Sequence, residues 1–279
     1  MNAFLKTAIA GAAAGLALAA QAVIIDDFNQ PTPGAQNATD TKSIALGESA
    51  GVSSSYDGTG VGAAIIGGHR DLYVIKTGGL DSQTKGISAT VENGTYSFNS
   101  DSLMAGVGII RWDGANTNFN QNSANSIATN LTDAVNSVDA NGFAAVDLQT
   151  TGSGAFVLDV LSADAGFKFM LQAFSNNGTK YSTFIETSLA GAHTYVIPFS
   201  VFSNIPALQC AGGVASGCAD FSQITALQAV INFPGAQVVD VDLTIDIVDN
   251  VVPEPAALGL VGLALVGAGV ARRRARKAA

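Results

Sequence analysis

The sequence predicts an all-β protein, an antiparallel β-sandwich with a short apolar segment at each end. Stretches between residues 87 and 248 alternate apolar and polar side chains, as strands with one buried and one wet face do. Two Asn-Gly pairs, Asn93-Gly94 and Asn177-Gly178, interrupt this alternation, and both positions of a tight hairpin turn need positive φ. Strand–helix–strand alternation is missing from the pattern, which favours antiparallel sheets.

The expected elements follow in order along the chain. Strands are predicted near residues 23–28, 87–98, 157–161, 166–188, 194–199 and 238–248. Residues 126–138 are expected to form a short helix, and residues 224–229 a brief turn. The Asn-rich stretch 115–141 is expected to be a long polar connection on the surface.

Residues 1–22 have the form of a secretory signal peptide. Lys6 precedes an apolar run, and Ala20-Gln21-Ala22 offers the small side chains that a signal peptidase accepts. We expect cleavage after Ala22, with export of the mature chain. An uncleaved N-terminal anchor is the alternative.

The C-terminal residues have the pattern of a membrane-spanning segment. Pro253-Glu254-Pro255 precedes the apolar residues 256–271, and a cationic cluster follows: Arg272, Arg273, Arg274, Arg276 and Lys277. As a single transmembrane helix the apolar run would reach ~24 Å, slightly short of a ~30 Å hydrocarbon core. Cations after such a span stay in the cytoplasm, so residues 23–255 are expected outside the membrane.

This arrangement resembles the PEP-CTERM sorting signal of Gram-negative bacteria. The resemblance implies export across the inner membrane, retention by the tail and processing near Pro253-Glu254-Pro255 by an exosortase, which leaves the protein at the cell surface or outside the cell. A plain C-terminal anchor is the alternative, because the same physics fits any short span with basic flanks. The implied domains are 1–22, 23–250 and 251–279.

Charge and cysteine content narrow the possible partners. Between the two ends lie seven Lys and Arg against 22 Asp and Glu, a net charge of about −15. Nucleic acid is therefore not an expected partner. Cys210 and Cys218 are expected to form a disulfide in an exported chain, with a metal pair as the weaker alternative.

The strand sequence resembles galactose-binding-like jelly rolls, a fold common in carbohydrate-binding modules. The segments that carry the resemblance are VIIDDF, HTYVIPFSVF, DFSQITALQAVINF and VDLTIDIVDNV. It implies that the first and last strands are neighbours. It also suggests that they share a structural calcium, whose candidate ligands are Asp26, Asp27, Asp246 and Asp249. Ordinary solvated carboxylates are the alternative.

Two other features bear on function. Trp112 and Tyr73 are candidates for a sugar-stacking platform, although a single Trp is as often a core residue. The motif around Ser49, Gly-Glu-Ser-Ala-Gly, matches a nucleophile elbow, but the Gly-rich residues after it do not favour the helix that an elbow requires.

Taken together, these patterns predict an exported, surface-sorted and non-catalytic β-sandwich that binds glycan or matrix polysaccharide. Two alternatives remain: a serine hydrolase that uses Ser49, and a purely structural surface or biofilm protein without a discrete ligand.

Overall fold

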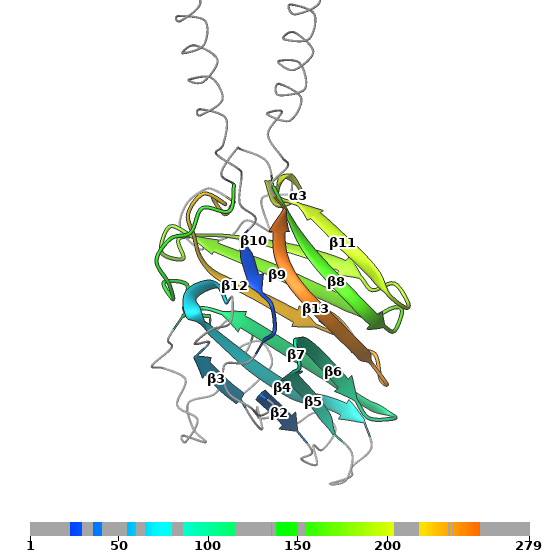
Figure 1. Ribbon diagram of the computed structural model, residues 1–279. Helices are drawn as coiled ribbons and strands as arrows, with labels where there is room; N and C mark the ends of the chain where they lie inside the picture. Colours follow the sequence, from blue (N-terminus) through cyan, green and yellow to red (C-terminus); the bar gives the residue numbers. More distant parts are fainter. Residues whose placement is uncertain are drawn as a thin grey trace, which may run out of the picture.

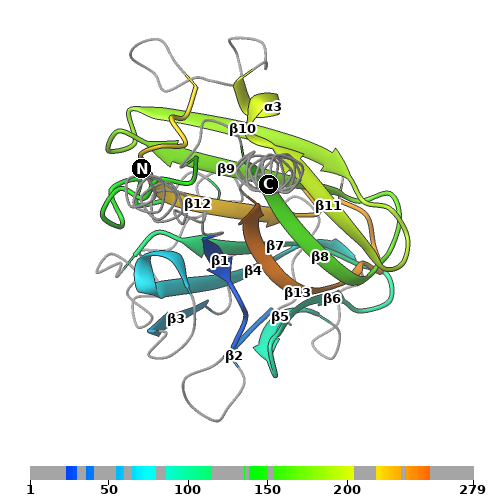
Figure 2. The same cartoon turned by 45° about the horizontal axis from the view of Figure 1, so that its top comes forward.

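Two antiparallel β-sheets packed face to face form the body of the protein in the computed structural model (Figures 1 and 2). The structure describes residues 23–29, 36–40, 55–59, 65–79, 86–114, 135, 138–149, 154–203, 218–233, 235 and 237–251. The predicted antiparallel sandwich is confirmed. The signal peptide, the sorting segment after Val251 and most of the predicted helix over 126–138 lie outside the described residues.

Each sheet has a fixed strand order. The first sheet, sheet A, runs β11 (His193–Pro198), β8 (Ala155–Ala163), β13 (Asp242–Val251), β6 (Thr95–Ser100), β5 (Ile87–Glu92) and β2 (Gln36–Asp40), and β1 (Ile24–Asp26) also pairs with β13. The second, sheet B, runs β10 (Lys180–Thr187), β9 (Lys168–Ser175), β12 (Ile224–Ile231), β7 (Met104–Trp112), β4 (His69–Gly79) and β3 (Ser55–Thr59). A 3₁₀ turn, η1 (Ile66–Gly68), precedes β4, and a short helix, α3 (Phe199–Ser203), follows β11.

Both predicted hairpins are present. Asn93 and Gly94 join β5 to β6 with φ of 53° and 81°. At the second turn, between β9 and β10, Asn176, Asn177 and Gly178 all have positive φ. Asn and Gly are the residues that tolerate this left-handed backbone, which is why these two turns are readable in the sequence.

The turn predicted at residues 224–229 is wrong. These residues belong to β12, which lies in the middle of sheet B between β7 and β9. Nearly every residue of β12 is buried, because both of its faces are covered. A strand buried on both faces loses the period-2 alternation, so its sequence cannot be told from a short buried helix.

The inner faces of the two sheets form the main hydrophobic core. Near one end of the sandwich, four phenylalanines of this core form an aromatic group with Phe156 in the middle. Phe156 makes edge-on contacts to Phe199, Phe202 and Phe221 at centroid distances of 5.0–5.8 Å. Close packing also explains Gly108 of β7: a Cβ there would lie 2.5 Å from the Phe98 ring. Only glycine allows β7 to approach sheet A so closely.

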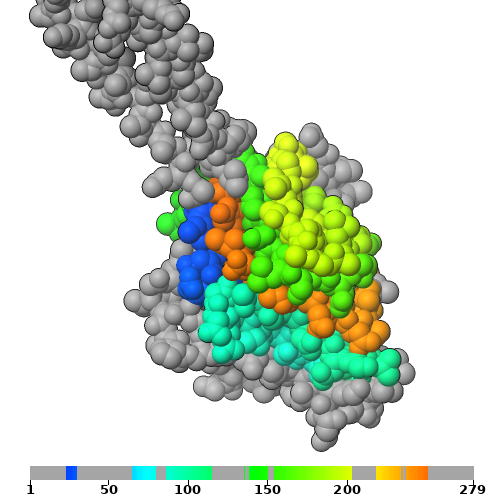
Figure 3. All heavy atoms as spheres, turned by 45° about the vertical axis from the view of Figure 1, so that its right-hand side comes forward, coloured from blue at the N-terminus to red at the C-terminus, as the bar shows by residue number. Residues whose placement is uncertain are grey.

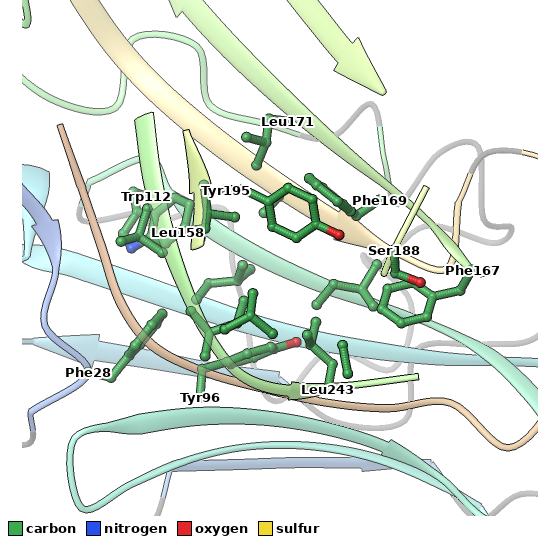
Figure 4. Close-up of a pocket in the computed structure, with 17 residues that line it drawn as sticks. Phe28, Tyr96, Trp112, Leu158, Phe167, Phe169, Leu171, Ser188, Tyr195 and Leu243 are labelled. Atoms are coloured by element: carbon green, nitrogen blue, oxygen red, sulfur yellow. The ribbon is translucent and has the colours of Figure 1, made fainter. Parts of the chain in front are cut away.

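A cavity of about 40 Å³ remains between the sheets (Figure 4). Its walls are almost entirely apolar, and Phe28, Tyr96 and Trp112 point into it. A space of this size with so few polar partners holds neither a sugar nor a well-bound water. We therefore regard it as a packing defect of the core.

Tyr96→Phe is expected to raise the melting temperature. The Tyr96 hydroxyl is fully buried and has no hydrogen-bond partner in the described part of the chain, and burial raises its pKa. Removing an unsatisfied buried hydroxyl relieves a desolvation cost of about 1–3 kcal/mol. Thermal unfolding measures the change. Tyr73→Phe is the matched control and should destabilise, because the Tyr73 hydroxyl accepts a hydrogen bond from Arg111 (3.2 Å). A lower melting temperature for Tyr96→Phe would contradict the prediction.

Candidate functional site

A row of polar side chains crosses the outer face of sheet B. It takes one residue from each of five neighbouring strands, in register: Thr183 of β10, Gln172 of β9, Gln228 of β12, Arg111 of β7 and Asp71 of β4. We call these five residues the polar row. Each occupies an outward-facing position in a strand whose inward-facing neighbours belong to the core, such as Leu171 and Leu227.

Hydrogen bonds connect the polar row from strand to strand. The Gln172 Nε2 donates to Thr183 Oγ1 (3.2 Å), and the Gln228 Nε2 donates to Gln172 Oε1 (2.7 Å). Arg111 donates through Nε to Gln228 Oε1 and through Nη1 to the Tyr73 hydroxyl. Each amide is thereby held in one orientation, so any group that it presents to a ligand is already positioned.

Apolar and aromatic residues border the polar row on both sides. On one side lies a second hydrophobic cluster that includes Tyr73, Ile109, Met170 and Val230. On the other, Phe174 of β9 and Tyr181 of β10 are directly paired across the strands and stack with ring centroids 5.7 Å apart and planes inclined by 29°. Both rings are half-buried, so each keeps part of its surface open to solvent.

Two carboxyl groups and one cation are buried together at the β4–β7 end of the polar row. Arg111, Asp71 and Asp113 are at most 1% exposed, and the Arg111 guanidinium lies 4.6 Å from the centroid of the Tyr73 ring. Burial raises the pKa of Asp113, while the Asp139 backbone N–H, the charge of Arg111 and a hydrogen bond with Asp71 act in the opposite direction. Since two carboxyl groups can share a hydrogen bond only when one is protonated, this end favours uptake of a proton.

The connection after β7 covers this same end. Val135 packs on the hydrophobic cluster and its carbonyl accepts a hydrogen bond from Gln228 (3.1 Å), while the Asp139 N–H donates to Asp113 (2.9 Å). The Gln172, Phe174 and Tyr181 end remains half-exposed. Access to the face is therefore through the β9–β10 side, where the aromatic pair lies.

The structure separates the two residues predicted to stack on sugar. Tyr73 lies on the outer face of sheet B and contacts the polar row. Trp112 is the next residue after Arg111 and points inward instead: it is 3% exposed, and its Nε1 donates to Asp26 (2.6 Å). Trp112 is thus a core residue, away from any surface on which a sugar ring could stack (Figure 4).

The expected pairing of first and last strands is confirmed. β1 is antiparallel to β13, with Ile24 opposite Asp249, and Figure 3 shows the two segments side by side on the surface. No three of their four aspartates form a group that could hold a metal ion. Asp26 is fully buried and both of its oxygens are engaged by Arg70, Trp112 and the Phe28 N–H.

The other three candidate calcium ligands lie in different surroundings. Asp27 accepts hydrogen bonds from Asn29, Asp246 is exposed, and Asp249 is half-buried with a raised pKa because of that burial. No group of three or more His, Cys, Asp or Glu side chains in the described ranges is arranged to hold a metal ion. Calcium binding by these residues therefore has no geometric support from the described part of the chain.

Several predicted residues lie outside the described ones. Cys210 is among them, so its pairing with Cys218 stays a prediction, although the described residues contain no free cysteine. Ser49 and the motif around it are also outside. Within the described ranges no helix is long and apolar enough to cross a membrane, and both apolar ends of the chain, residues 1–22 and 252–279, lie outside those ranges.

Comparison with protein families identifies the C-terminal end. Residues 251–276 match the family model of the PEP-CTERM protein-sorting motif. The chain carries a PEP-CTERM sorting motif. The predicted sorting residues Pro253, Glu254, Pro255 and Arg272 to Arg274 all lie within the match, and the motif implies an exported substrate of an exosortase. The match covers the tail and leaves the function of the sandwich open.

The sandwich itself has distant structural similarities. One is to the family 11 carbohydrate-binding module of cellulase Lic26A-Cel5E of Clostridium thermocellum, at 14% identity and TM-score 0.35 over 83% of this chain and 94% of that one. A second is to the family 11 module from Clostridium thermocellum in complex with a β-1,3-1,4-mixed-linked tetrasaccharide, at 14% identity and TM-score 0.33 over 77% of this chain and 96% of that one. A third is to the agarase AgWH50C, at 11% identity and TM-score 0.36 over 60% of this chain and 22% of that one. At TM-scores this low we base no inference on these similarities. No curated protein matches the chain.

Proposed function

We propose that this is an exported, surface-sorted and non-catalytic protein that binds a neutral polysaccharide on the outer face of sheet B. The observation that carries the proposal is the half-exposed Phe174–Tyr181 pair beside the oriented amide of Gln172. Pyranose rings present apolar faces that suit aromatic side chains, and their hydroxyls suit amides that both donate and accept.

Charge supports a neutral ligand. Residues 23–255 carry about −15, from seven cations against 22 acidic residues, so an anionic polysaccharide would be repelled. Arg111, the cation of the polar row, is fully buried and already balanced by Asp71 and Asp113. It therefore orients Gln228 and offers no open site for an anion.

Burial of the carboxyl groups argues for binding without hydrolysis. Glycoside hydrolysis uses a pair of carboxyl groups that reach the bond to be cleaved. Asp71 and Asp113 are each 1% exposed, and Asp139 and the segment around it lie over Asp113. Neither carboxyl can touch a chain laid across Phe174 and Tyr181.

The sorting motif completes the proposal. The tail would hold the protein in the inner membrane of a Gram-negative bacterium until an exosortase acts near Pro253-Glu254-Pro255. Signal peptidase would act at the other end, after Ala22. The binding face would then be presented at the cell surface or in the extracellular matrix.

Tyr181→Ala and Phe174→Ala are each expected to weaken polysaccharide binding about tenfold, since loss of a stacking ring costs about 1–1.5 kcal/mol. Affinity electrophoresis of residues 23–250 through gels that contain mixed-linkage β-glucan, agarose or soluble cellulose measures the effect. Tyr181→Phe keeps the ring and should keep most of the affinity.

Val196→Ala is the matched control on the other sheet. Val196 is 61% exposed on β11 of sheet A, so its truncation should leave migration unchanged. If none of the neutral polysaccharides retards the wild-type protein, the binding proposal fails and a structural surface role is favoured. Equal losses for Val196→Ala and Tyr181→Ala would place binding elsewhere.

A further inference from the structure

The sorting motif begins inside the folded sandwich. The family match starts at Val251, which is also the last residue of β13 and is paired with Ala155 of β8. Pro253 is only two positions further along the sequence. A single residue therefore separates the end of the sheet from the first proline of the motif.

Asn250 fastens this end of β13. It is fully buried, and its side chain accepts a hydrogen bond from the Val23 N–H (2.5 Å) and donates one to the Leu148 carbonyl (2.7 Å). Its own N–H donates to the Val23 carbonyl (3.1 Å). The last two residues of β13 are thus held by β8 on one side and by the chain just before β1 on the other.

The packing beneath this end is equally firm. Asn250 lies opposite Phe156, the centre of the aromatic group formed with Phe199, Phe202 and Phe221. In Figure 1, α3 lies at the same end of the sandwich as the tip of β13. An end that is bonded on both sides and packed from below opens rarely.

An enzyme that processes the motif needs more free chain than this end provides. One residue spans at most about 3.5 Å, too little to carry a peptide from the edge of a folded domain into an active-site cleft. A strand that is paired in a sheet cannot at the same time lie extended in the cleft of an enzyme.

We propose that the sandwich controls its own processing: the sorting enzyme acts only after the last residues of β13 have detached from β8 and from Val23, and Asn250 sets how often that occurs. The tail is then retained while the end of β13 stays paired with β8 and bonded to Val23; we call this state the closed corner. The proposal uses the sorting part of the proposed function and is independent of polysaccharide binding.

The test follows loss of a tag placed after Ala279 of the full chain, by pulse–chase in a host that contains an exosortase. Inserting Gly-Ser-Gly-Ser between Val251 and Val252, directly after the last residue of β13, supplies free chain and replaces none of the described residues. We expect processing to accelerate roughly tenfold, because the enzyme can then reach the motif while β13 stays paired, whereas wild-type cleavage must wait for the rarely populated open state. The same four residues inserted between Ala279 and the tag should have no effect.

Asn250→Ala is the second variant and should accelerate processing roughly tenfold as well, since it removes side-chain hydrogen bonds that only the closed corner makes. Asn99→Ala is its matched control. Asn99 bonds Asp242 at the opposite end of β13, so this variant should be processed at the wild-type rate.

The outcomes are distinguishable. If the linker variant is processed as fast as wild type, the gating proposal is overturned while processing itself stands. If no variant loses its tag in a host with the enzyme, the tail is a plain anchor and both the gating and the processing proposals fail. Polysaccharide binding, measured on residues 23–250, is unaffected by either result.

Discussion

Arg70→Ala is expected to destabilise the sandwich by about 3–5 kcal/mol, because it removes one partner of a fully buried ion pair. Arg70 and Asp26 are both completely buried, and Arg70 donates to Asp26 through Nε (2.6 Å) and also through Nη2. Without the guanidinium, the Asp26 carboxylate would remain in the core, and the donors left to it among the described residues would be the Trp112 and Phe28 N–H groups.

The effect of this substitution should depend on pH. Burial raises the pKa of Asp26, and Arg70 is the strongest influence that opposes the rise. In Arg70→Ala the opposition is lost, so the folded-state pKa rises further and folding favours the protonated acid. The variant is therefore least destabilised below the usual pKa of an aspartate, about 4, and loses stability as the pH increases through the raised value.

Thermal and urea unfolding at several pH values measure both effects. For a domain of this size we expect the melting temperature to fall on the order of 10 °C at neutral pH. Asp27→Ala is the matched control: Asp27 follows Asp26 directly, is only partly buried and accepts hydrogen bonds from the exposed Asn29, so its truncation should cost much less than loss of a fully buried ion pair. A shift for Arg70→Ala no larger than that of the control would contradict the prediction.

Arg111→Ala is expected to cost a similar amount, about 3–5 kcal/mol, on the opposite face of sheet B. Arg111 orients Gln228, bonds the Tyr73 hydroxyl and offsets the charge of Asp113. Its removal leaves two buried carboxyl groups, Asp71 and Asp113, without the cation. Gln172→Ala, at the half-exposed end of the same row, should cost only about 1 kcal/mol.

A second substitution tests the electrostatic cause. Asp113→Asn replaces a carboxyl group, whose pKa is raised by burial, with a neutral amide. It should therefore restore part of the stability that Arg111→Ala loses. Because the folded-state pKa lies above the unfolded value, the protonated form is the one that the fold favours. The stabilisation by Asp113→Asn should thus be small near about pH 4 and increase toward about pH 8. Unfolding of the two single variants and the double variant at both pH values completes the cycle. Strictly additive losses would refute the proposed coupling.

Much of the fold is readable in the sequence, and the candidate site is readable only in part. Leu-Gln-Ala occurs twice, at residues 171–173 and 227–229, with a polar amide at an outward-facing position of an otherwise apolar strand. That repeat is a signal for Gln172 and Gln228 that our sequence-based prediction missed. Tyr73 was anticipated as a site residue and lies beside the polar row. Trp112 and Asp26 are core residues instead, and the four aspartates form no common metal site among the described residues.

Local signals explain what the sequence determines by itself. Alternation with period 2, the Asn-Gly turns at residues 93–94 and 177–178, and the contiguous motif at residues 251–276 each depend on neighbours along the chain. Their physical causes are the pleat of a strand, the tolerance of Asn and Gly for positive φ, and the apolar length that a membrane requires. These causes act wherever the segment is placed in the fold.

Tertiary structure alone decides which strands meet and in which register. Gln172 and Gln228 are 56 residues apart and Arg70 lies 44 residues from Asp26, yet each pair is in contact. A shift of one residue in the pairing of β12 would turn Gln228 into the core and Leu227 to the outside. Register is selected by the burial of all strands at once, so the polar row, the buried ion pair and the fastening of β13 by Asn250 follow from the assembled sandwich and not from any one segment.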